Sequence, residues 1–230
     1  MDAPEAMIPP SDPTKLHAWF KAHPGSEQIA SPFALVALAW WVQREAWRHR
    51  GRPRFTIADI GSGIGTTLAC LAWWAGHAEI VSAEIISVEH DLWCQEQARQ
   101  HLGHLGMTLD AALGILYYDK LPAYMGFDFL VLDGPQIRSS DWRCLVRGAT
   151  VFVEGGRREQ RKELAHALRA AGRPFCWATW KPTDRSKGFS VYRVEPTVWE
   201  RLWFAAVRLR ECWRDLWARC HGVTVGKRRA

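Results

Sequence analysis

The chain has 230 residues, and 48% of them are hydrophobic, which is enough for one α/β-sized domain with a sizeable core. The formal net charge of +6 permits an acidic partner, but residues 199–230 hold eight basic residues against three acidic ones. The rest of the chain is therefore close to neutral, and the charge makes no strong case for a nucleic-acid-binding protein.

Cysteine usage and the N-terminal sequence indicate a cytoplasmic protein. The six cysteines form no Cys-x-x-Cys pair and show no metal-like spacing with histidine, as expected of reduced cysteines in the cytosol. Residues 1–21 contain prolines and acids but no apolar segment of the secretory type. The longest apolar run, residues 33–42, is far shorter than the ~20 residues of a membrane-spanning helix.

The N-terminal region is expected to be a loose arm followed by two helices. Four prolines lie within residues 1–13 and oppose regular structure. Helices are predicted over residues 14–22 and 31–50, the second with Ser31 as N-cap and Pro32 in its first turn.

Residues 55–68 are the stretch around which the other elements are placed. Residues 55–60 form a short apolar run typical of a buried strand, and glycines follow at positions 61, 63 and 65. Thr66 and Thr67 then open a stretch with helical apolar periodicity. The sequence therefore predicts a strand, a tight glycine loop and a helix whose free N–H groups face a ligand.

Strand and helix patterns alternate through the remainder of the body. After the first helix, which runs to about Gly76, a strand over residues 84–89 and a helix over 92–105 are expected, and a further helix follows at 158–171. The other predicted strands lie at 112–117, 127–132, 148–153, 173–179 and 188–194. This order predicts an α/β fold with a Rossmann-like, seven-stranded, mostly parallel sheet, helices on both faces and one antiparallel strand near an edge.

Acidic residues stand at the ends of the predicted strands. Asp59 lies two residues before the first glycine, Glu89 ends the second strand, and Asp133 follows the fourth. Because the carboxyl ends of parallel strands meet at one edge of a sheet, these side chains are expected to share one crevice.

The acid-x-Gly-x-Gly-x-Gly pattern differs from the dinucleotide motif, whose third glycine comes one residue later. Together with Val88-Glu89-His90-Asp91 and the Asp133-Gly134-Pro135 strand end, it resembles class I S-adenosylmethionine-dependent methyltransferases. The resemblance covers about residues 55–194. It implies a site for S-adenosyl-L-methionine in which Glu89 accepts hydrogen bonds from the ribose hydroxyls.

The resemblance also assigns the remaining site residues. His90 and Asp119 are candidates for contacts with the adenine, and Asp133 is the candidate for acceptor alignment or general base. The predicted cofactor-binding residues are Asp59, Gly61, Ser62, Gly63, Gly65, Thr66, Glu89, His90, Asp119 and Asp133. The helices before the first strand either cover the acceptor or only pack on the sheet.

Within this superfamily the chain is nearer the small-molecule O-methyltransferases. The fourth strand ends in Asp133-Gly134-Pro135-Gln136 and not in the Asn/Asp-Pro-Pro-aromatic loop of enzymes that methylate adenine or glutamine amides. The fifth ends in an acidic turn, Glu154-Gly155-Gly156-Arg157, where a metal-dependent branch has two ligands for Mg²⁺. A metal site using Asp133 and Glu154 stays open, and a surface ion pair between Glu154 and Arg157 is favoured.

Residues 196–220 predict a long amphipathic helix. Tryptophan and leucine occupy one half of its helical wheel, and charged residues the other. Three interpretations stay open: packing against the domain or a second subunit, peripheral contact with a membrane, and binding of nucleic acid, which the acids on the polar half disfavour.

The sequence thus divides into an N-terminal arm and helical cover (1–50), a cofactor-binding domain (51–195) and a Trp-rich helix with a basic tail (196–230). The preferred function is S-adenosylmethionine-dependent O-methylation of a small molecule or sugar-like acceptor. The alternatives are a membrane- or partner-associated module with a vestigial nucleotide site and, less favoured, a nicotinamide-dependent oxidoreductase.

Overall fold

The computed structural model describes residues 12–76, 83–107, 115–118, 125–133, 144–155, 158–182 and 188–220. The helices are α1 (Pro13–Lys21), α2 (Pro32–Arg48), α3 (Thr66–Gly76), α4 (Leu92–His104), α5 (Arg158–Ala170) and α6 (Val198–Cys220), with a short 3-10 helix η1 (Ser26–Gln28) after α1. The strands are β1 (Phe55–Ile60), β2 (Ala83–Val88), β3 (Ile115–Tyr118), β4 (Phe127–Leu132), β5 (Leu145–Glu154), β6 (Phe175–Trp180) and β7 (Phe189–Val194).

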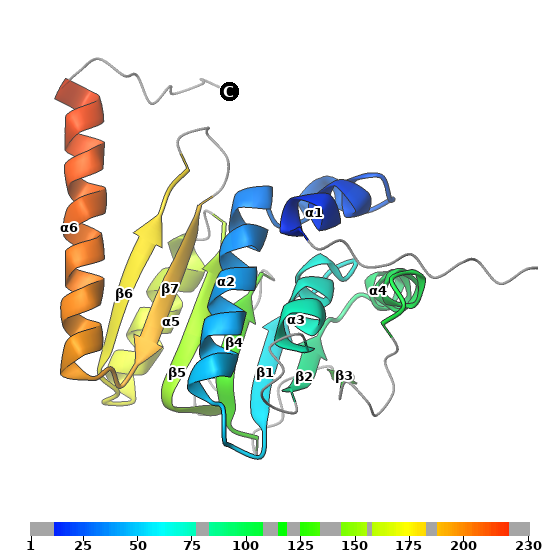
Figure 1. The fold of residues 1–230 in the computed structure, drawn as a ribbon, viewed down its shortest axis with the longest axis horizontal. Helices are drawn as coiled ribbons and strands as arrows, with labels where there is room; N and C mark the ends of the chain where they lie inside the picture. The colour runs from blue at the N-terminus through cyan, green and yellow to red at the C-terminus, as the bar shows by residue number, and fades with distance from the viewer. Residues whose placement is uncertain are drawn as a thin grey trace, which may run out of the picture.

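The strands form one mixed sheet in the order β3-β2-β1-β4-β5-β7-β6. The pairs from β3 to β5 are parallel, whereas β7 runs antiparallel to both β5 and β6. Helices cover both faces of this sheet, with α2 and α3 in front of it and α5 behind in Figure 1. The predicted α/β, Rossmann-like architecture is therefore confirmed.

Two apolar clusters, one on each face, hold the sheet between the helices. Successive strand residues alternate between them: Ile57 packs with α1, α2 and α3, and the next residue, Ala58, packs with α5. All six residues of β1 and of β4 are buried, as expected of central strands covered on both faces.

The N-terminal helices begin where the sequence predicts and pack closely on the domain. Asp12 caps α1, and the Ser31 side chain accepts the Ala34 N–H at the start of α2, with Pro32 in the first turn. Helix α2 ends at Arg48, two residues earlier than predicted, and contacts α3 and α1 along its buried side.

A buried ion pair joins α2 to the antiparallel strand. Arg193 of β7 and Glu45 of α2 are 1% and 0% exposed, and the guanidinium binds both carboxylate oxygens. The Arg193 Nε also lies 3.1 Å from Glu200 Oε1 of α6, and Arg48 lies 2.7 Å from the same oxygen. Residues from α2, β7 and α6 therefore share one network of charges.

Helix α6 runs along the β6 edge of the sheet (Figure 1), and the side that faces the domain is not the tryptophan-rich half. The packed stripe is Glu200, Phe204, Val207, Glu211 and Arg214, in which Phe204 is 2% exposed and Arg214 donates to the Lys181 carbonyl at 2.6 Å. One form of the first interpretation was that the apolar half packs on the domain. Among the members whose side chains are described this is wrong except for Trp203, which contacts Trp41. The opposite side of the helix packs instead, because Glu200 and Arg214 have polar partners on the domain.

Candidate active site

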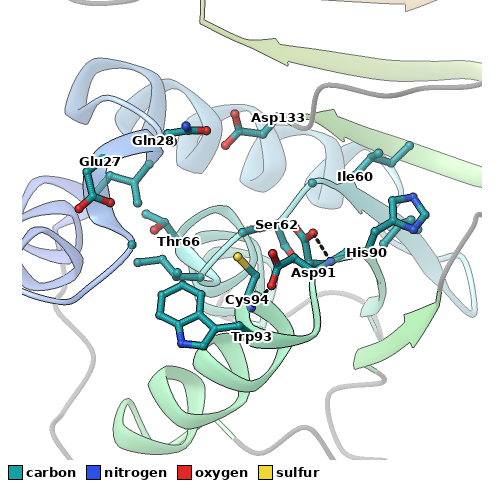
Figure 2. Close-up of a pocket in the computed structure, with 17 residues that line it drawn as sticks. Glu27, Gln28, Ile60, Ser62, Thr66, His90, Asp91, Trp93, Cys94 and Asp133 are labelled. Atoms are coloured by element: carbon teal, nitrogen blue, oxygen red, sulfur yellow. Dashed lines mark hydrogen bonds between the residues drawn. The ribbon is translucent and has the colours of Figure 1, made fainter.

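A cavity of about 720 Å³ opens where the carboxyl ends of β1, β2 and β4 meet. Ile60 is in register with Val88 on one side and with Leu132 on the other, so the residues that follow these three strands are neighbours. The cavity is lined by Gly25, Glu27, Gln28, Ile29, Ile60, Gly61, Ser62, Gly63, Ile64, Thr66, Val88, Glu89, His90, Asp91, Trp93, Cys94 and Asp133. Figure 2 shows this lining, with Asp133 and Trp93 on opposite sides of it.

The glycine loop needs glycine at all three positions. Gly61, Gly63 and Gly65 have φ angles of 80°, 54° and 96°, which side chains disfavour. Gly61 donates its N–H to the Val88 carbonyl at 2.8 Å, which ties the loop to the end of β2. A Cβ on Gly65 would lie 3.0 Å from the Cβ of Ala98, so this glycine lets α4 approach the loop.

Glu89 is fixed against this loop by backbone hydrogen bonds. Its Oε2 accepts the Gly63 N–H at 2.8 Å, and its Oε1 accepts the Asp91 N–H at 3.0 Å. A carboxylate offers about four lone-pair positions, so two further hydrogen bonds can form on the cavity side. Glu89 is thus held in a fixed position, with acceptor capacity left on its carboxylate.

Ser62 and Thr66 bring hydroxyl groups to the lining. Ser62 Oγ accepts a hydrogen bond from Ser87 at 2.8 Å. Thr66 begins α3, and its buried Oγ1 has no hydrogen-bond partner among the described residues. An unpartnered hydroxyl at a helix N-terminus is suited to a polar part of a ligand.

Asp133 and His90 also lie in the cavity wall, as predicted. The Asp133 N–H donates to the Ile60 carbonyl at 2.9 Å, and the residue is 8% exposed. His90 follows Glu89 and is exposed, on the far side of the loop from Trp93 in Figure 2. The structure therefore brings His90, Glu89 and Asp133 to one cavity.

Two predicted cofactor residues do not line the cavity, and a third cannot be placed. Asp59 is fully buried at the end of β1, where its Oδ2 accepts the Thr67 hydroxyl at 2.9 Å. Burial, together with the negative charges of Asp133 and Glu89, raises the pKa of Asp59 to about 8. Gly65 faces α4, and Asp119 lies outside the described residues. Asp59 and Gly65 thus stabilise the loop through contacts outside the cavity, with Thr67 and Ala98.

The segment between α1 and α2 contributes cavity residues that the sequence did not reveal. Gly25 has a φ of 82°, and a Cβ on it would lie 2.8 Å from side-chain atoms of both Ile64 and Trp93. This close packing brings η1, which follows Gly25, to the cavity. Glu27 and Gln28 of η1 form the wall opposite the glycine loop (Figure 2). The Pro24-Gly25 turn was the only local signal, and it does not indicate what the turn contacts.

Glu154 lies apart from the cavity lining. Glu154 is 2% exposed and accepts the Ser31 N–H at 3.4 Å, so it does not lie on the surface as predicted. Its predicted ion-pair partner, Arg157, lies outside the described residues. No group of three potential metal ligands occurs in the described part of the chain.

No family model matches the chain, and no curated protein is similar to it in sequence. Solved structures share its fold. An O-methyltransferase from Bacillus cereus in complex with S-adenosylhomocysteine aligns with a TM-score of 0.55 and 15% identity, over 82% of this chain and 93% of that one. An S-adenosylmethionine-dependent O-methyltransferase from Thermotoga maritima gives 0.57 and 18%, over 82% and 72%.

A third similar structure is the O-methyltransferase of Streptomyces achromogenes involved in tomaymycin synthesis, in complex with S-adenosylmethionine. It aligns with a TM-score of 0.51 and 15% identity over 83% of this chain and 92% of that one. The chain therefore has the Rossmann-like fold of the S-adenosylmethionine-dependent methyltransferases, along most of the length of these proteins.

Proposed function

We propose that this protein is an S-adenosylmethionine-dependent methyltransferase that methylates an oxygen of a small-molecule acceptor. One observation carries the proposal: the Glu89 carboxylate, anchored on the Gly63 N–H, lies beside the glycine loop in the cavity wall. The proteins of like fold that are crystallised with S-adenosylhomocysteine or S-adenosylmethionine support it.

The residues around the cavity fit this cofactor. The cavity has a volume of about 720 Å³, which is within the usual range for ligand pockets and leaves room for an acceptor beside a ligand of nucleoside size. Glu89 would hold the ribose hydroxyls, the Gly61–Gly63 backbone would lie along the sugar and methionine, and Trp93 and His90 would flank the base. When bound, the cofactor supplies a methyl group activated on a sulfonium.

The chain's own task is then to align the acceptor and to exclude water. Asp133 lies at the end of β4 in the cavity wall, where a carboxylate can orient an acceptor hydroxyl and accept its proton. Glu27 and Gln28 of η1 add polar groups to the lining, with Gln28 on the same side of the view as Asp133 in Figure 2, so the N-terminal cover is proposed to contact the acceptor.

Calorimetry with S-adenosylhomocysteine and with NAD separates this proposal from the oxidoreductase alternative and from a vestigial site. We expect binding of the first and none of the second. Failure to bind S-adenosylhomocysteine would remove the methyltransferase assignment. A cytoplasmic location stays a prediction from the sequence.

A substitution at Glu89 tests the role of the carboxylate. Glu89→Gln keeps the shape and an acceptor for Gly63 but removes the charge, so binding of S-adenosylhomocysteine should weaken by about 1–3 kcal/mol. Glu84→Gln is the matched control, because Glu84 lies near the start of β2, the strand that Glu89 follows, and is paired with Arg54. Equal affinities of the two variants would contradict the assignment of Glu89.

A further inference from the structure

The exposed side of α6 is apolar along its described length. Trp199, Leu202, Leu209 and Trp213 are 80%, 56%, 72% and 70% exposed, and Ala206 lies in the same row. Their spacing of three and four residues places them on one face, opposite the packed stripe that begins at Glu200. A soluble helix normally buries such a face, so this one is open to a partner.

The apolar row of α6 continues onto α2. Trp203, 38% exposed, lies between the row and the domain, and the Arg44 guanidinium is 5.2 Å from its ring centre. The same guanidinium is 5.1 Å from the ring of Trp40, which is 51% exposed. We call the set of Trp40, Arg44, Trp199, Leu202, Trp203, Ala206, Leu209 and Trp213 the Trp surface.

The exposed charges around the Trp surface are of one sign among the described side chains of α2 and α6. Among the described side chains of α2 and α6, the acids are Glu45, Glu200 and Glu211, whose side chains are only 0%, 14% and 16% exposed and paired with arginines. The charged residues of the two helices that are exposed, among those whose side chains the structure describes, are all arginines, namely Arg48, Arg201, Arg208 and Arg210. An anionic partner is therefore complementary to this part of the molecule.

We propose that the Trp surface binds the interface of an anionic lipid bilayer. Indole rings favour the headgroup level, and arginines beside an apolar row add attraction to negative lipids. A second copy fits less well, because a symmetric contact would place the same arginines against one another. Within the described residues no helix is long and apolar enough to cross a membrane, and α6 lies with its length on the domain, so the contact is peripheral.

Flotation with lipid vesicles tests the proposal on the full chain. The protein should float with vesicles of phosphatidylcholine and phosphatidylglycerol, remain unbound with phosphatidylcholine alone, and dissociate in high salt. Replacing both exposed tryptophans, as Trp199→Ser with Trp213→Ser, should lower partitioning roughly tenfold or more. Both side chains are largely exposed, so circular dichroism and binding of S-adenosylhomocysteine should be unchanged.

A matched pair of charge variants tests the electrostatic part. Arg201→Gln with Arg210→Gln should reduce binding to anionic vesicles about tenfold, since each arginine near such a surface contributes several-fold. Arg158→Gln with Lys162→Gln removes the same charge from α5, on the opposite face of the sheet, and should leave binding unchanged. Equal effects of the two pairs would overturn the proposal.

Two other outcomes would also overturn it. If light scattering shows a dimer that the two tryptophan substitutions dissociate, and vesicles do not bind, the partner is a second copy. If single-stranded RNA binds through the Trp surface and competes with vesicles at equal ionic strength, the partner is nucleic acid.

Discussion

At the scale of single residues, Asp59 has a carboxyl group where ionisation is costly. Burial raises its pKa from the usual 3.8 to about 8, and the neighbouring carboxylates of Asp133 and Glu89 add to the shift. The folded protein therefore holds the group protonated at pH values where the unfolded chain has lost the proton. Its contribution to stability is complete below about pH 4 and is lost as the pH rises to about 8.

The variant Asp59→Asn tests this linkage, because an amide has nearly the same shape and cannot ionise. Relative to the wild type, the free energy of unfolding of the variant should rise by on the order of 5 kcal/mol between about pH 4 and about pH 8. Urea denaturation across this range measures the difference. Parallel curves for the two proteins would mean that Asp59 is ionised in the folded state.

Gly65 has a different role from Gly61 and Gly63, the two glycines of the loop that line the cavity. Its φ of 96° and the 3.0 Å approach to Ala98 predict that Gly65→Ala destabilises the fold by roughly 2–4 kcal/mol. Gly103→Ala in α4 is the control, because its Cβ would have nothing within 4 Å, and it should stabilise by up to about 1 kcal/mol. Thermal denaturation compares the two, and equal melting temperatures would refute the packing role.

Sequence reasoning located those site residues whose position follows from strand ends. Glu89 and Asp133 could be placed beside the glycine loop because adjacent parallel strands end at one edge. Gly25 and Glu27 could not, since their place depends on how the segment before α2 folds back across Ile64 and Trp93. Asp59 was predicted to bind the cofactor, but it is buried and does not belong to the cavity lining, which a linear pattern does not show.

At the scale of elements, the ends of helices and strands agree with the predicted ones to within a few residues, because caps, glycines and apolar runs are local signals. No local signal in the sequence showed which side of α6 packs on the domain. A helical wheel shows which residues share a side, but not which side the rest of the molecule covers. Here the covered side carries Glu200, whose partners Arg193 and Arg48 come from β7 and α2.

That arrangement gives α6 two unlike sides. Phe204 and Val207 provide the apolar contact with the domain, while Glu200 and Arg214 add directed polar contacts at either end of the packed stripe. The helix can therefore stay attached without Trp199 and Trp213, and of its described tryptophans only Trp203 packs against rings of the domain. This is the physical reason why the Trp surface is available to a partner.

At the scale of the whole molecule, the charges of Glu45 and Arg193 connect the N-terminal cover to the far part of the sheet. A buried pair of this kind costs desolvation but is far more costly to break than to keep. This contact joins two residues that are far apart in the chain, so no spacing in the sequence predicts it. The N-terminal helices are consequently tied to the body of the fold by more than apolar packing.

The pair also yields a prediction about cooperativity. Arg193→Leu leaves Glu45 buried without its main partner and should lower the free energy of unfolding by about 3–5 kcal/mol. The double variant Arg193→Leu with Glu45→Leu removes both charges and should be distinctly more stable than the single one, since Glu200 keeps its contact with Arg48. Urea denaturation of the single variants and the double variant gives the coupling energy. Strictly additive effects would show that Glu45 and Arg193 do not compensate each other, and α2 would then be held by its apolar contacts alone.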